Sequence, residues 1–136
     1  SVDINSFAPN FEISKLGNHF KLSETRGNYV IVNFWTSDDA EARIRNIHYD
    51  RFFKSIGKNL SFISVNFDDS DNMFKELVRT DGLSEVSQFY EKDGMESEVY
   101  KRYRLKSGMN SYLLDKDGKI LAINPTQQQL TKYFCQ

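Results

Sequence analysis

A run of β-branched and aromatic residues, Tyr29–Trp35, constrains the fold of this chain more than any other feature. Only Asn33 interrupts its apolar and aromatic side chains. The run lacks the alternation of polar and apolar residues expected of a strand with one face in water. It is typical of a strand buried on both faces, as in a parallel sheet covered by helices. We therefore expect an α/β fold built around this strand.

One long helix is expected after this strand. A polar patch at residues 36–39 is followed by apolar residues at helical spacings of three, four or five. The pattern ends before Gly57, and glycine is a typical helix terminator. The stripe expected to face the core consists of Ile44, Ile47, Phe52 and Ile56.

Shorter elements complete an alternating order of strands and helices. Residues 60–67 predict a second central strand, which ends in an acidic cluster at residues 68–71. The order predicts a mixed central sheet with helices on both faces and right-handed βαβ crossovers, in one domain spanning residues 1–136. The other expected elements are an N-terminal hairpin at 11–22 around Gly17-Asn18, a helix at 73–78 stopped at Asp81-Gly82, a strand at 83–90, a helix at 96–103, a hairpin of 111–114 and 119–123, and a helix at 126–134.

The charge balance excludes several classes of function. The formal net charge is −1, from 18 basic and 19 acidic residues, with no long run of either sign. This pattern predicts neither a nucleic-acid footprint nor an electrostatic membrane anchor. The longest apolar block falls short of the roughly 18 residues that span a bilayer. The sequence starts at Ser1 rather than Met, so it carries no information on a removed export segment.

Cysteine usage limits the chemistry further. The only cysteine is Cys135, the penultimate residue of this sequence. A single thiol excludes an internal disulfide and a cysteine-based metal cage. Dithiol exchange is excluded as well, because it needs a thiolate nucleophile and a second thiol that resolves the mixed disulfide. Cys135 itself is expected to be an exposed, ordinary thiol, with intermolecular pairing or a single-thiol redox role in trans as alternatives.

Several short motifs occur in an order shared with a known family. They are Ala8-Pro9-Asn10-Phe11, Leu22-Ser23 with Gly27, residues 30–37, and Tyr103 with the closing hairpin at 112–120. Together they resemble the thioredoxin-like superfamily, in particular the TlpA-like thiol–disulfide proteins related to the alkyl hydroperoxide reductase/thiol-specific antioxidant group. The resemblance covers nearly the whole chain. It implies a thioredoxin fold and a location in the bacterial periplasm or cell envelope.

The sequence departs from this family at the redox site. Aligning Phe34-Trp35 and Arg43 with the family pattern places the two catalytic cysteines at Asp39 and Ala42. A peroxidase of this group would need a thiolate near Thr36, and no cysteine stands there. The resemblance therefore implies a thioredoxin fold that has lost its thiol chemistry.

The loop that faces the redox pair in the family also differs here. Its cis-proline falls at Met109, and the proline that kinks the long helix falls at Ile47. A cis peptide without proline costs about 2.5–4 kcal/mol, so we expect a trans bond. In active relatives this region holds an extended segment of a partner protein. The candidate groove residues are Trp35, Thr36, Ser37, Asp38, Gly108, Met109 and Asn110.

Two functions from different classes follow. The first is a redox-inactive module that binds another protein or a peptide and needs no cofactor. The second is a non-thiol enzyme or a Ca²⁺ or Mg²⁺ site, because acids after neighbouring strands can meet at one sheet edge. Its carboxylates would be Asp38, Asp39, Asp68 and Asp69. Helix capping is the alternative role for the acids before the long helix, Asp38, Asp39 and Glu41, since Asp38 and Glu41 have capping-box spacing.

Other candidate residues have structural interpretations beside functional ones. Trp35 is either an anchor on a binding surface or a core residue under the first helical turn. His48 is expected on the flank or surface of the long helix, without a partnered nucleophile, and His19 is expected to face solvent. A basic group is expected to be a solvated face, with an acidic partner as the alternative. Its members are Lys101, Arg102, Arg104 and Lys106.

Overall fold

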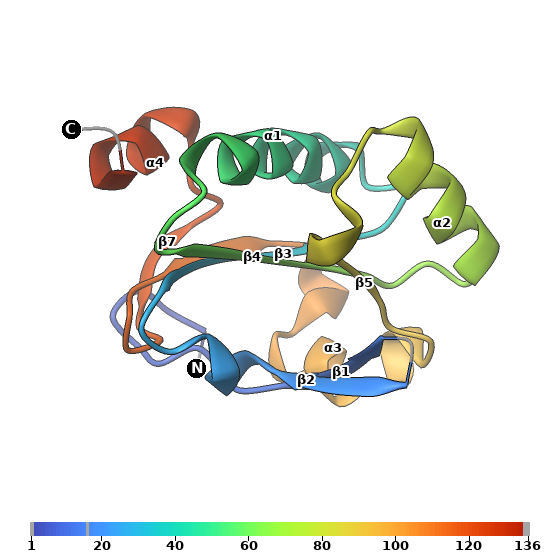
Figure 1. The fold of residues 1–136 in the computed structure, drawn as a ribbon. Coiled ribbons are helices and arrows are strands. Elements are labelled where there is room, and N and C mark those ends of the chain that lie inside the picture. The colour runs from blue at the N-terminus through green and yellow to red at the C-terminus, as the bar shows by residue number, and fades with distance from the viewer. Residues whose placement is uncertain (1, 16, 135–136) are drawn as a thin grey trace.

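A five-stranded mixed sheet forms the centre of the protein (Figure 1). The computed structural model describes residues 2–15 and 17–134. The strand order is β5-β4-β3-β6-β7; β3, β4 and β5 are parallel, whereas β6 and β7 pair antiparallel. This confirms the predicted mixed sheet. The strands are β3 (Tyr29–Trp35), β4 (Leu60–Asn66), β5 (Gln88–Tyr90), β6 (Ser111–Leu114) and β7 (Ile120–Ile123).

Both faces of the sheet are covered (Figure 1). One face carries α1 (Ala40–Ile56), α2 (Asp71–Thr80) and α4 (Gln127–Phe134). The other carries α3 (Glu98–Arg102) and the predicted N-terminal hairpin, a separate two-stranded sheet of β1 (Glu12–Lys15) and β2 (Asn18–Lys21). Among the described residues, no helix has the length and apolar character needed to cross a membrane.

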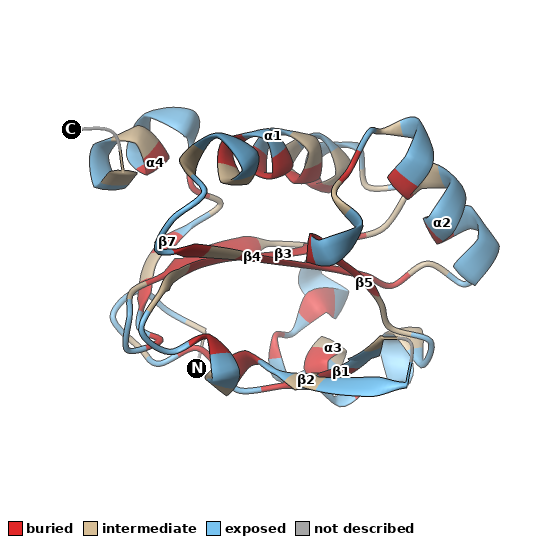
Figure 2. Ribbon diagram, viewed as in Figure 1, coloured by how far each residue is buried: buried red, intermediate tan, exposed pale blue. Residues whose placement is uncertain are grey.

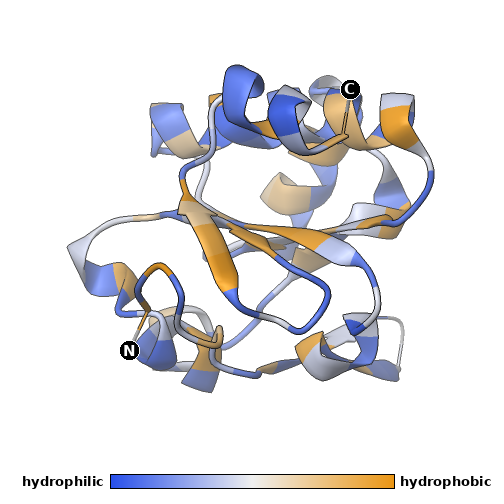
Figure 3. Cartoon of the chain, turned by 90° about the vertical axis from the view of Figure 1, so that its left-hand side faces the viewer, coloured by the Kyte–Doolittle hydropathy of each residue, from blue (hydrophilic) through white to orange (hydrophobic). Residues whose placement is uncertain are grey.

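The central strands are apolar on both sides, as the run at Tyr29–Trp35 predicts. Figure 2 shows the sheet and the inner faces of the covering elements as buried, and Figure 3 shows hydrophobic residues along the central strands. The ring of Phe34 lies 4.7 Å from that of Tyr103 and 5.9 Å from those of Phe11 and Phe67, measured between centroids. Aromatic contacts thus fasten the N-terminal segment and the α3 region to the sheet.

The predicted stripe of α1 is confirmed at Phe52, Ile47 and Ile56, which are buried or packed against the core, but is wrong at Ile44. Ile44 is 53% exposed, while Asn46 is fully buried. The Asn46 amide oxygen accepts hydrogen bonds from Ser64 Oγ at 2.6 Å and from Gln88 Nε2 at 3.0 Å. Because these buried polar groups satisfy one another, they can face the sheet, and the apolar pattern alone does not identify them. The buried residues of α1 are Ala42, Asn46, Tyr49, Asp50 and Phe52.

Two shorter elements also differ from the sequence expectation. The strand expected at 83–90 is limited to β5, because residues 85–87 form a 3₁₀ turn. The helix expected at 96–103 is divided into a 3₁₀ turn at Gly94–Glu96 and α3. Ser97 separates the two, and its hydroxyl caps α3 by accepting the N–H of Tyr100.

Candidate functional site

The segment after β3 holds the positions predicted for the family's cysteines. Asp39 is the N-cap of α1, and its carboxylate accepts the N–H of Ala42 at 3.1 Å. Ala42 is fully buried. The predicted capping role of Asp38 is therefore wrong: its carboxylate accepts the hydroxyl of Thr36 at 2.6 Å within the preceding turn. The helix begins one residue later than the capping-box spacing assumes.

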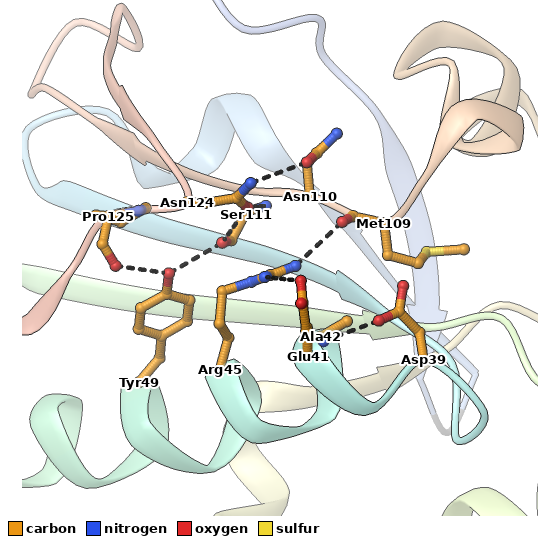
Figure 4. A network of polar contacts seen from close by, with 10 residues as sticks. All are labelled: Asp39, Glu41, Ala42, Arg45, Tyr49, Met109, Asn110, Ser111, Asn124 and Pro125. Atoms are coloured by element: carbon orange, nitrogen blue, oxygen red, sulfur yellow. Dashed lines mark hydrogen bonds and ion pairs between the residues drawn. The ribbon is translucent and has the colours of Figure 1, made fainter.

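The loop at residues 108–110 lies beside this helix start (Figure 4). Met109 is half-buried and packs against the cluster that contains Trp35 and Ala42. The Asn110 carbonyl accepts the N–H of Phe34 at 3.1 Å, which joins the loop to β3. No cis peptide bond occurs in residues 2–15 and 17–134, so the expected trans bond at Met109 is present. The end of β3, the start of α1 and this loop thus form one surface.

Arg45 holds this loop from α1, a role that the sequence analysis missed. Its Nη2 donates to the Met109 carbonyl at 3.1 Å, and its Nη1 lies 4.0 Å from a Glu41 carboxylate oxygen. The side chain is only 20% exposed, and its Nε is buried with no hydrogen-bond partner among the described residues. The one sequence signal for this residue is its i,i+4 spacing from Glu41.

A buried polar network fixes the base of the same loop (Figure 4). The Tyr49 hydroxyl contacts Ser111 Oγ at 3.0 Å and donates to the Pro125 carbonyl at 2.9 Å. Asn124 accepts the N–H of Ser111 at 2.8 Å, and its amide nitrogen donates to Asn110 Oδ1 at 3.0 Å. Burial raises the pKa of the Tyr49 hydroxyl, against a smaller opposing effect of its hydrogen bond with Ser111, so the hydroxyl stays protonated at neutral pH and can donate to the Pro125 carbonyl. The loop is therefore held from α1, β6 and the end of β7.

Trp35 belongs to the core and is not a surface anchor. It is 0% exposed and packs with Ala42, Phe74, Val78 and Leu83. Its indole fills the space between the end of β3, α1 and α2, so the binding-anchor interpretation is wrong. The remaining groove candidates stay accessible: Asp38 is exposed, and Thr36, Ser37, Gly108, Met109 and Asn110 are partly exposed.

The acidic residues at the sheet edge bind local donors. Asp68 accepts the Ser37 N–H at 2.8 Å and the Asn66 side-chain amide at 3.0 Å. The Asp38 carboxylate accepts the Thr36 hydroxyl, and the Asp39 carboxylate caps α1, as described above. Across residues 2–15 and 17–134, no three His, Cys, Asp or Glu side chains gather as ligands for a metal ion. This arrangement does not favour the predicted cation site.

The remaining candidate residues of the sequence analysis, the two histidines and the basic group, are exposed to solvent. His48 and His19 are exposed, as expected, and His19 lies 3.2 Å from Glu12. The basic group at 101, 102, 104 and 106 is exposed as well, as expected of a solvated face, and its contact with an acidic partner stays a prediction. Cys135 lies outside the described residues.

Removing the Arg45 side-chain charge is expected to loosen the loop. Arg45→Met deletes a charged donor to the Met109 carbonyl, so we expect a loss of about 1–2 kcal/mol in unfolding free energy. Amide hydrogen exchange at residues 108–110 should become faster. Glu41→Gln is the matched control, because an exposed carboxylate at 4.0 Å contributes at most about 0.5 kcal/mol. Equal exchange in both variants would mean that Arg45 does not hold the loop.

Comparisons with known proteins agree with this geometry. The model of the AhpC/TSA family matches residues 4–123. The thiol-disulfide oxidoreductase ResA of Bacillus thuringiensis subsp. konkukian is 28% identical over 141 residues, which cover 98% of this chain and 78% of ResA. A thioredoxin-like protein from Parabacteroides distasonis is 36% identical, with a TM-score of 0.75 over 79% of each chain. The thioredoxin domain of a thiol-disulfide oxidoreductase from Bacteroides vulgatus is 25% identical, with a TM-score of 0.80 over 98% of this chain and 96% of that domain. The chain therefore belongs to the AhpC/TSA family and has the fold of thioredoxin-like thiol-disulfide oxidoreductases.

Proposed function

We propose that this chain is a redox-inactive thioredoxin-like domain that binds a segment of another protein. The observation that carries the proposal is the residue content at the start of α1. Asp39 caps the helix and Ala42 is a buried residue of its first turn, while the only cysteine of the sequence stands at position 135. A carboxylate and a methyl group cannot form or resolve a mixed disulfide. The family's chemistry is therefore not carried by these residues.

The binding surface of this proposal is the rim formed by the 36–38 turn and the 108–110 loop. Both segments are partly exposed, yet hydrogen bonds to Asp68, Arg45 and Asn124 hold them in place. A fixed surface loses little conformational entropy on binding, which favours a recognition role. Arg45 occupies one acceptor position of the Met109 carbonyl, and in this proposal a bound segment contacts the Met109 and Asn110 side chains.

The location and chemistry of the partner complete the proposal. Family resemblance supports a site of action in the bacterial periplasm or cell envelope. No cofactor enters the proposed role. The partner is a protein or peptide, and the near-neutral charge of the chain gives no reason to expect a nucleic acid.

Site-specific crosslinking tests the binding role. A benzophenone amino acid in place of Met109 is expected to crosslink one discrete protein in the native cells under ultraviolet light. The same amino acid in place of His48, which is exposed elsewhere on α1, is the matched control and should give no such product. The absence of a product at Met109, or an identical product at both positions, would contradict the proposal.

A further inference from the structure

A groove of about 1000 Å³ opens at the β5 edge of the molecule, outside the rim described above. Its walls are β1 on one side and α2 on the other, with Phe74 and Val78 of α2 and Tyr90 of β5 among the lining residues. Figure 1 shows the hairpin and α2 on opposite faces of the sheet beside β5. The groove therefore lies between two layers of the fold, next to two edge strands. They are β5 of the central sheet and β1 of the hairpin.

One wall of this groove is an unpaired strand edge. In an antiparallel pair, alternate residues point their N–H and C=O groups at the partner strand. The N–H of Leu22 donates to the Phe11 carbonyl, so the backbone groups of Phe11 face the partner strand. Ile13 and Lys15 lie two and four residues further along, so their backbone N–H and C=O groups also face β2. Glu12 and Ser14 point their backbone groups away from β2. Both residues line the groove, so β1 offers a free row of donors and acceptors to it.

The edge of β5 is less open than that of β1. Lys15 reaches across to bond the Glu85 carbonyl, and its ammonium lies 4.7 Å from the centre of the Phe89 ring. Burial lowers the pKa of Lys15, against a smaller opposing effect of Glu85. A lysine placed over an edge strand hinders the addition of another strand there. The free edge of β1 is therefore the better template in this groove.

The charges around the groove define the kind of chain that fits. Five carboxylates line it against three lysines. Lys75 is paired with Asp71 at 3.1 Å, and Lys15 is held by the Glu85 carbonyl. The surplus of negative charge favours a cationic ligand, and a side chain opposite Glu12 on a docked strand would meet its carboxylate.

We propose that β1 is a docking edge for an extended segment of a partner protein in which Lys or Arg alternates with apolar residues. The segment adds to β1 as a third strand through the backbone groups of Glu12 and Ser14. Its apolar side chains enter the groove against Phe74, Val78 and Tyr90, and its cations lie on the outer side beside Glu12. This site is separate from the 36–38 and 108–110 rim and does not depend on it.

A short peptide of alternating Lys and Val tests this proposal by NMR titration of the intact chain. We expect binding, with amide shifts centred on Glu12 and Ser14. Ser14→Pro removes an N–H that β2 does not use, so the hairpin is retained while affinity falls about tenfold. Ser14→Ala keeps the N–H and should bind within about twofold of the native chain. A peptide of alternating Glu and Val should bind at least about tenfold more weakly.

Several results would overturn the proposal. They are no binding of the Lys–Val peptide, equal affinity for the two peptides, or equal affinity of folded Ser14→Pro and the native chain. If Ser14→Pro does not fold, the test uses the native chain and the Lys–Val peptide methylated at alternate backbone nitrogens. Undiminished binding of this methylated peptide would then contradict the proposal. Self-association of the free protein that is lost in Ser14→Pro would assign the edge to a second copy and overturn the partner assignment.

Discussion

Replacement of Trp35 by alanine is expected to lower the free energy of unfolding by about 3–5 kcal/mol. The indole is 0% exposed and contacts Ala42 from α1 as well as Phe74 and Val78 from α2. Its removal leaves a cavity where β3, α1 and α2 meet, which rigid neighbours cannot fill. Denaturation by urea, followed by circular dichroism, measures the loss.

Ile44→Ala is the control for this measurement. Ile44 is a large apolar residue on α1 that the sequence pattern places in the core, but its side chain is 53% exposed. We expect a change within about 0.5 kcal/mol. If Trp35→Ala cost no more than Ile44→Ala, the indole would be a surface residue, and the interpretation of Trp35 as a binding anchor would be restored.

The sequence predicts the central elements well because their signals are local. The run at Tyr29–Trp35 forms β3 with the expected bounds. The long helix ends where Gly57 adopts a left-handed backbone, with φ of 72°, which glycine accepts without strain. In the closing hairpin the Asp115 carboxylate accepts the N–H groups of Asp117 and Lys119, both at 2.9 Å, so the turn residues encode the turn themselves.

The parts that the sequence could not predict depend on partners far along the chain. Asn46 is buried because Ser64 and Gln88 satisfy its amide, and neither is near it in sequence. The same holds for Arg45, whose acceptor is the Met109 carbonyl. A helix face with polar residues is ordinarily assigned to solvent, so both residues are missed by apolar periodicity.

The candidate site also has parts that the sequence could predict and parts that it could not. The thioredoxin fold and the family could be recognised from motifs in the expected order, and both are confirmed. The assignment of Asp39 and Ala42 to the former cysteine positions stays a prediction based on resemblance. The groove beside β1 could not be foreseen, because it depends on how the hairpin and α2 are placed around the β5 edge.

Two cysteines at the start of α1 are expected to create dithiol activity, which the proposed redox-inactive role assigns to none of the native residues there. In the Asp39→Cys, Ala42→Cys variant, the first thiol stands at the N-terminus of a 17-residue helix. Helix N-termini lower the pKa of a thiol and favour the reactive thiolate. The second thiol lies one turn along, where it can resolve a mixed disulfide. The fixed loop at 108–110 completes the surface on which a disulfide substrate would rest.

The reduction of insulin by dithiothreitol, followed by turbidity, tests the proposed absence of dithiol chemistry most directly. The native chain, the double-cysteine variant and a matched Asp39→Ser, Ala42→Ser variant are compared, each also with Cys135→Ser. We expect the native chain and the serine variant to match dithiothreitol alone, and the double-cysteine variant to exceed it clearly. Reduction of insulin by the native chain above the dithiothreitol rate, whether or not Cys135 is present, would contradict the proposed redox-inactive role.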